Sequence, residues 1–347
     1  MTVFSKAIGF FMSLLLSLVL MAQEDELSIY EMEDEKFREL FTMDIKLKLA
    51  SPHNIHHMHE KGDIMVRIMH LNMAKEGLLD GSSELSLADA NAAYMVAPKS
   101  MDMSMDVLGV MYAPTDDITL MFMIDATTKS MDLNRRMMMV DTPFSTDSSG
   151  IGDFTVDILY ALEDTDTNQF IISAGLSIPT AKINHRDDTP MAADMILPYG
   201  MQLGSGTVDP RIALTYIHIY ELHTLGFYAN ARLRLYDNYR GYHLGDEFKA
   251  TGWITYFLDA SKAIIVRLDY ESKGNISGED DELVFGMSPM ADPDQYARES
   301  ICAGLGFTYL KDDWQFYANI SIPIHENVDG IQLEKDLSYS VGITRTF

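Results

Sequence analysis

Methionine and histidine side chains gather near the start of the sequence and are the residues whose types most suggest chemistry. The chain of 347 residues holds 25 methionines, and four histidines fall between residues 53 and 59. Thioether and imidazole groups are the ligands that the soft ions Cu(I) and Ag(I) prefer. The candidate ligands are His53, His56, His57, His59, Met65, Met69, Met121 and Met123. Because they follow no fixed ligand spacing, methionines used as apolar filler and histidines on a solvated loop remain the competing interpretation.

Acidic clusters form a second candidate site. Carboxylates gather at residues 279–282, at Asp292 with Asp294, and at Asp187 with Asp188. Such hard oxygen ligands suit Ca²⁺, although no loop of EF-hand form is present. A solvated acidic surface explains the same residues, since carboxylates prefer water.

Charged residues inside segments of alternating polarity form a third group. If these segments are strands of a barrel, their polar faces line its lumen, where mixed charges either set the selectivity of a channel or form an ion-pair lattice that closes it. Both alternatives stay open. The candidate lumen residues are Arg67, Asp102, Asp106, Asp157, Arg232, Arg234, Arg267 and Asp269.

An enzymatic barrel would need an activated serine. The sequence has no Gly-x-Ser-x-Gly elbow, and the run from Gly204 to Gly206 is better explained as a tight turn from loop to strand. We therefore expect no enzyme and no catalytic residues.

A period of two begins at Asp63 and predicts the strands that must position these groups. Leu225, Phe227 and Ala229, for example, alternate with Tyr228 and Asn230. We predict twelve strands near residues 63–74, 101–113, 117–129, 151–163, 168–180, 207–220, 223–237, 247–258, 262–273, 299–310, 313–324 and 336–347. Strands of this length suit a tilted membrane span. Short and long linkers alternate between them, as periplasmic turns and outer loops do in an outer-membrane barrel.

This topology sets the depth of the candidate ligands. The first and third strands run the same way, so Met65 and Met69 lie level with Met121 and Met123, two strand spacings or roughly 9–10 Å away. On the strand between them we expect Asp102 and Asp106 to face the lumen, with Met101, Met103 and Met105 facing lipid.

The start of the chain predicts export. Lys6 precedes an apolar run that ends before Gln23, which is typical of a cleaved signal peptide. We expect a signal peptide at 1–22, a periplasmic extension at 23–62 and a barrel at 63–347. No later stretch is long and apolar enough for a spanning helix, so a membrane protein of this sequence must be a barrel, in contact with bacterial outer-membrane lipid.

Composition and the last strand add two expectations. The net charge of −26, from 52 acidic and 26 basic residues, excludes a nucleic-acid partner, whose phosphates need a basic surface. The amphipathic strand ending in Phe347 resembles the assembly signal of outer-membrane barrels, which implies the barrel-assembly machinery as a partner.

Several segments resemble one bacterial outer-membrane family, described as transporters of the MetA pathway of phenol degradation. They include 56–63, 101–105, 148–153, 186–190, 203–207, 241–246 and 291–294, within a resemblance that spans residues 56 to 347. The resemblance implies a barrel that takes up aromatic compounds and specifies no substrate site.

We therefore expect an all-β, up-and-down transmembrane barrel that acts as a channel or transporter for small molecules, including hydrophobic or aromatic ones. An envelope protein that handles copper or silver, and a structural barrel with a plugged lumen, are the alternatives. No cofactor is expected beyond a Cu(I) or Ca²⁺ ion at the candidate sites.

Overall fold

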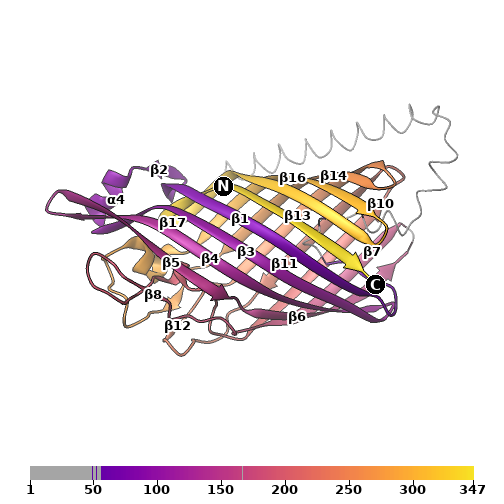
Figure 1. Ribbon diagram of the computed structural model, residues 1–347, viewed down its shortest axis with the longest axis horizontal. Coiled ribbons are helices and arrows are strands. Elements are labelled where there is room, and N and C mark those ends of the chain that lie inside the picture. The colour runs from indigo at the N-terminus through magenta and orange to yellow at the C-terminus, as the bar shows by residue number, and fades with distance from the viewer. Residues whose placement is uncertain (1–48, 50–51, 53–55, 166) are drawn as a thin grey trace.

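In a computed structural model, which describes residues 49, 52, 56–165 and 167–347, eleven strand elements close into an antiparallel ring (Figure 1). Each element pairs with its neighbours along the chain, and the last pairs back with the first. The expected all-β barrel fold is confirmed. The elements are β1 (Ile64–Gly81), β3 (Val96–Thr115), β4 (Ile118–Met137), β6 (Phe154–Asp164), β7 (Asn168–Ile178), β10 (Asp209–Ile219), β11 (His223–Arg232), β13 (Glu247–Asp259), β14 (Lys262–Lys273), β16 (Arg298–Lys311) and β17 (Trp314–Thr346).

The last element, β17, crosses the wall twice. Its first half pairs with β16 from Trp314 to Val328, and its second half pairs with β1 up to Thr346. The chain reverses near Gly330, which has a φ of +66°. A closed ring whose pairs are all antiparallel needs an even number of passes, so the eleven elements supply twelve. The even count also brings both ends of the wall together, where the backbones of Ile64 and Phe347 exchange hydrogen bonds.

The alternation in the sequence separates an outer from an inner face. On β1, Ile64 and Ile68 are 44% and 57% exposed on the outside, whereas Met65 between them is 2% exposed. Apolar side chains such as Ile158, Leu305 and Ile320 continue this exposed band around the barrel. Such a band is the lipid-facing surface of a membrane barrel. In the described residues, no helix has the length and hydrophobicity to cross a membrane.

The alternation of short and long connections is also confirmed, with two corrections. The segments 130–150 and 325–335, which we expected to be long loops, are mostly extended hairpins. In the first, β5 (Val140–Ile151) pairs with β4 beyond the membrane-spanning region. The outer face there is polar, because water replaces lipid, so the hydrophobic alternation that marks a strand is lost.

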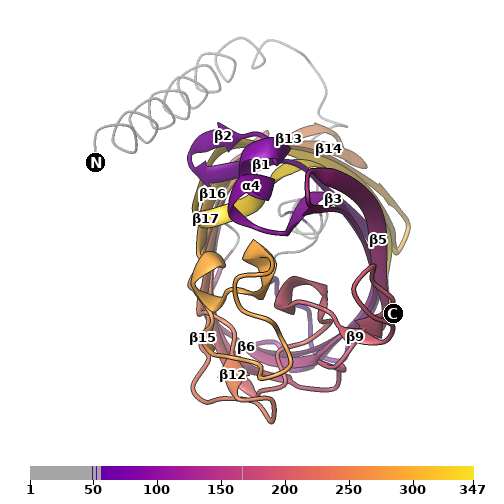
Figure 2. The same ribbon diagram turned by 90° about the vertical axis from the view of Figure 1, so that its left-hand side faces the viewer.

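The remaining loops fold over one end of the barrel. Figure 2 looks into this end and shows the segments around β9 and after β15 inside the ring of strands. These loops carry β2 (Ser83–Leu85), α4 (Leu87–Ala93), β8 (Arg186–Asp187), β9 (Met195–Ile196), η1 (Tyr199–Met201), β12 (Tyr242–His243), β15 (Ser277–Gly278), η2 (Pro289–Ala291) and η3 (Pro293–Gln295).

One inward-facing glycine makes room for a large ring. Gly226 on β11 is paired with Trp253 on β13, and a Cβ at residue 226 would lie 2.0 Å from the indole. The substitution Gly226→Ala should therefore lower the free energy of unfolding by about 1–3 kcal/mol, the usual cost of overpacking. Gly252→Ala is the matched control, because its Cβ would meet nothing within 4 Å. Denaturant unfolding followed by tryptophan fluorescence measures both, and equal stability of the two variants would contradict the packing argument.

Candidate functional site

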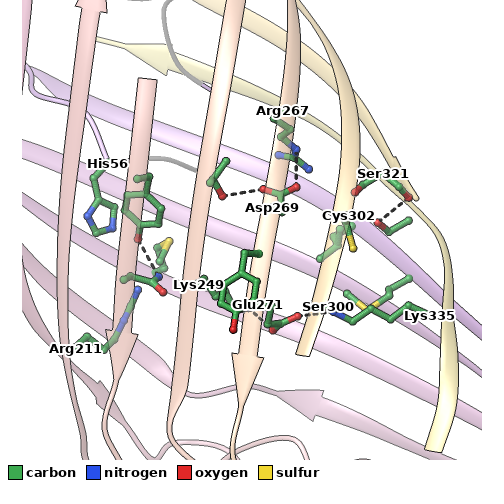
Figure 3. A pocket seen from close by; sticks show the side chains of 18 of the residues that line it. His56, Arg211, Lys249, Arg267, Asp269, Glu271, Ser300, Cys302, Ser321 and Lys335 are labelled. Carbon is green, nitrogen blue, oxygen red and sulfur yellow. Dashed lines mark hydrogen bonds and ion pairs between the residues drawn. The ribbon is translucent and has the colours of Figure 1, made fainter. Parts of the chain in front are cut away.

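Two adjoining cavities occupy the middle of the lumen. The first, of about 310 Å³, lies along β11, β13, β14, β16 and β17 (Figure 3), and the second, of about 450 Å³, lies beneath the loops along β3, β4 and β6. Arg67, Met123 and Arg211 line both cavities and mark their junction. At the junction, Nη2 of Arg67 lies 3.3 Å from the Met123 sulfur, and Nη1 of Arg211 lies 3.1 Å from a carboxylate oxygen of Asp157.

Paired charges line the first cavity. Figure 3 shows Arg267 beside Asp269, with a nitrogen-to-oxygen distance of 3.1 Å. Towards the loop end, Glu271 lies between two lysines, 3.0 Å from Nζ of Lys249 and 2.5 Å from Nζ of Lys335. These pairs are held by register, because alternate residues of β14 face the lumen and meet the inner faces of β13 and β16.

The second cavity is lined by both cationic and apolar side chains. Lys129, Arg232 and Lys273 contribute the cationic groups from β4, β11 and β14. In the described residues, neither Lys129 nor Lys273 forms a salt bridge. The apolar part is a patch of thioethers from β1, β3 and β4, namely Met69, Met103, Met105 and Met123, in which Met103 is the direct cross-strand partner of Lys129.

The charge of the cavities is opposite to that of the whole chain. Eight cationic side chains and five carboxylates line the two cavities together, whereas the chain as a whole carries 26 basic and 52 acidic residues. Two further carboxylates that do not line the cavities also pair with these cations. They are Asp157 with Arg211, and Glu247 with Arg232 at 4.0 Å. The lumen is thus enriched in positive charge although the protein is strongly acidic.

Most of the candidate lumen residues face the interior. Arg67, Arg232, Arg267 and Asp269 line the cavities, and Asp157 is 2% exposed beside Arg211. Arg234 lies just beyond β11, buried in contact with the carboxylates of Asp209 and Glu247.

The predicted position of Asp102 and Asp106 was wrong. Both are exposed on the outer surface, where Asp106 accepts a 2.8 Å hydrogen bond from His70. They stand above the apolar band, so the outer face of β3 is polar there because it meets water rather than lipid. The same register turns Met103 and Met105 inward, opposite to the expectation.

Cavity residues that sequence reasoning missed continue the inner face of predicted strands. Lys129 follows Met121 and Met123 at even spacing on β4, and Glu271 and Lys273 follow Asp269 on β14. All three lie within the predicted strands 117–129 and 262–273, so following the period of two to the ends of these strands would have found them.

An inward loop closes the second cavity towards the outside. Lys129 Nζ donates hydrogen bonds to the carbonyl oxygens of Gly200 and Gln202, at 2.9 and 2.6 Å. Asp153, which lies between β5 and β6, accepts a hydrogen bond of 2.9 Å from the backbone N–H of Ser205. Met201 at the centre of this loop is fully buried. The loop is therefore fixed across the lumen from two sides.

The described part of the extension lies inside the other end of the barrel. Nδ1 of His56 lies 2.9 Å from the Ser173 hydroxyl, inside the barrel. Met58 packs against inner-wall residues near the same level, and Leu49 is fully buried against Phe257 and other inner-wall side chains. Apolar contacts thus hold these residues of the extension against the inner wall near the base of the lumen.

The structure brings three of the four candidate methionines together. Met65 and Met121 pack in one buried cluster, Met123 packs against this cluster and lines both cavities, and Met69 lines the second cavity. His57 and His59 lie on the extension with their rings 4.8 Å apart, and His53 lies outside the described residues. No three His, Cys, Asp or Glu side chains in the described ranges come together as a metal site.

Two carboxylates of the acidic cluster at 279–282, Asp280 and Glu282, pair with arginines. Arg240 donates to Asp280 and Glu282, each at 2.8 Å through Nη2, and Arg186 also pairs with Glu282. Glu282 thereby joins three loops across the mouth. Calcium binding by these loops stays a prediction.

This arrangement predicts a pH response of the mouth. Hydrogen bonds from Arg240 and Arg186 lower the pKa of Glu282 below its ordinary value of about 4.3. Because the folded-state pKa lies below the unfolded one, the stabilisation is complete above about pH 4.3 and is lost as the pH falls through the folded-state pKa. Proteolysis of the loops should therefore accelerate in acid. Glu282→Gln should show the faster cleavage already at neutral pH, and an unchanged pH profile in this variant would contradict the assignment.

Comparison with known proteins agrees with this architecture. A family model described as "Putative MetA-pathway of phenol degradation" matches residues 86–341. The structure resembles the COG4313 outer membrane channel from Pseudomonas putida F1, with a TM-score of 0.59, 13% identity and coverage of 86% of this chain and 100% of that one. A TodX monoaromatic hydrocarbon channel variant (TM-score 0.42, 11% identity, 83% and 91% covered) and the NanC porin (0.41, 9%, 80% and 98%) are more distant. No curated protein matches.

The fold, its exposed apolar band and the family match together identify a protein of the bacterial outer membrane. The match covers well over half of the chain. The chain belongs to the family of the MetA pathway of phenol degradation.

Proposed function

We propose that this protein is an outer-membrane channel for small molecules that combine an aromatic or other apolar body with a negative charge. The observation that carries the proposal is the cationic lining of the two lumen cavities in a chain of net charge −26. Anions are stabilised beside such a lining, while cations are repelled.

The second cavity matches both parts of such a molecule. Lys129 and Lys273 supply positive charge to this cavity, and the thioethers of Met103 and Met105 on β3, the strand next to Lys129, supply apolar surface. Methionine sulfur makes favourable contacts with aromatic rings. Volumes of about 310 and 450 Å³ lie at the lower end of the range for small-molecule pockets, which favours single-ring compounds over larger ones.

The inward loop lies across the lumen and the described part of the extension lies inside its opposite end, so passage of a substrate requires movement of both. Each of these two elements is held in the barrel by only a few contacts. Two lysine hydrogen bonds and the contacts of Asp153 hold the loop, and short apolar contacts hold Leu49 and Met58. Moving such weakly held elements costs less free energy than unfolding the barrel itself.

Swelling of liposomes that contain the purified protein tests the substrate class. Benzoate, benzyl alcohol and benzylammonium have one ring and similar size but differ in charge. Benzoate should enter fastest and benzylammonium slowest. Equal rates, or fastest entry of benzylammonium, would contradict the proposal, and no swelling above protein-free liposomes would favour a structural barrel with a plugged lumen.

A further inference from the structure

Four methionines converge in the lower lumen, below the two cavities. Met65 on β1, Met111 on β3 and Met121 on β4 are direct neighbours in register, so they form one row across three strands. Met58 of the extension and Met123 of β4 pack against this row, whose buried cluster also contains Leu159 and Ile171. Cβ atoms of directly opposed residues lie about 4.5–5.5 Å apart, a separation that the long methionine side chains can easily span.

We propose that Met58, Met65, Met111 and Met121 form a binding site for a soft monovalent metal ion, Cu(I) or Ag(I). Four thioethers from four separate segments supply a complete soft ligand set, and thioethers select Cu(I) over harder ions. The flexible methionine side chain lets sulfurs from a flat row turn towards one centre.

The charge beside this row comes from an ion pair, whereas cationic side chains are in excess in the cavities above. Asp157, directly paired with Met121, places a buried carboxylate beside the site, and Nη1 of Arg211 lies 3.1 Å from this carboxylate. Met123 is excluded, because the Arg67 guanidinium lies against its sulfur. Met69 is excluded because it lines the second cavity with Met103 and Met105.

The site can be reached from the lumen. Met121 and His56 line the first cavity, so an ion that enters this cavity meets the edge of the methionine row. Because Met58 belongs to the extension, metal binding would also fasten the extension to the wall.

Anaerobic competition titration of the purified full barrel with the Cu(I) chelator bicinchoninate tests the proposal. The wild type should take one Cu(I) ion per barrel from the chelator. The variant Met65→Leu/Met111→Leu keeps volume and apolarity nearly constant and should lose affinity by about 100-fold or more, beyond the 10–100-fold that outer-shell changes cause.

Met103→Leu/Met105→Leu is the matched control, since it removes two sulfurs from the second cavity only, and its affinity should equal that of the wild type. X-ray absorption of the copper-loaded wild type should show sulfur neighbours. Failure of the wild type to compete, equal affinity of wild type and the Met65/Met111 variant, or equal loss in both variants would overturn the site. These outcomes are independent of the channel proposal, because the titration measures no transport.

Discussion

Replacing Lys129 by alanine is expected to raise the conductance of the protein in planar bilayers severalfold. Lys129 donates two hydrogen bonds to the loop carbonyls of Gly200 and Gln202. Hydrogen bonds that involve a charged group contribute about 1.5–3 kcal/mol each. Loss of even one such contribution shifts the balance between closed and open loop positions by about 10- to 100-fold towards the open one.

The control for this prediction is Lys262→Ala. Lys262 pairs with Asp259 at a short turn outside the lumen, so its removal changes the same kind of side chain without touching the loop. Conductance of the Lys129 variant equal to that of the Lys262 variant would show that this loop does not limit ion flow.

Charge reversal in the second cavity should have the other large effect. Lys273 lines this cavity and forms no salt bridge within the described ranges. The substitution Lys273→Glu changes the local charge by two units, and at an effective dielectric between that of water and of a protein surface this should lower the chloride-to-potassium permeability ratio roughly tenfold. Reversal potentials in a KCl gradient measure the ratio.

Lys99→Glu is the matched control, since Lys99 is exposed at the start of β3 and the same charge change there leaves the lumen unaltered. A permeability ratio that shifts equally in both variants would point to the overall charge of the protein instead of the cavity lining.

The strands of the barrel wall could be predicted from the sequence because lipid requires apolar side chains on their outer face. On the outside, Ile64, Ile68 and Leu108 must be apolar, whereas on the inside Arg67 and Asp269 line the first cavity, so the period of two is strong. The strands predicted at 247–258 and 262–273 therefore match β13 and β14 to within one residue.

The period of two in hydrophobicity no longer shows which side chains face outward where both faces of a strand meet water. Asp102 and Asp106 are polar on the outer face, and the methionines on the inner face between them are apolar, so the pattern inverts and the sequence suggested the wrong side. Register with β1 resolves the ambiguity, because Met103 is paired with Met73 and Met105 with Leu71.

Closure of the lumen was beyond sequence reasoning for a different reason. The contact between Lys129 and Gly200 joins residues 71 positions apart, and its acceptor is a backbone carbonyl that any residue could supply. The packing of Leu49 on Phe257 is a contact of the same long-range kind. No local pattern encodes such contacts, since they depend on how the loop and the extension enter the barrel.

The most direct test of the proposed function is the reversal potential of the wild-type channel in planar bilayers under a KCl gradient. The cationic lining predicts a potential displaced towards that of chloride, and addition of benzoate should reduce the chloride current by competing for the same cavities. A potential displaced towards that of potassium, or a current indifferent to benzoate, would contradict an anion-selective channel.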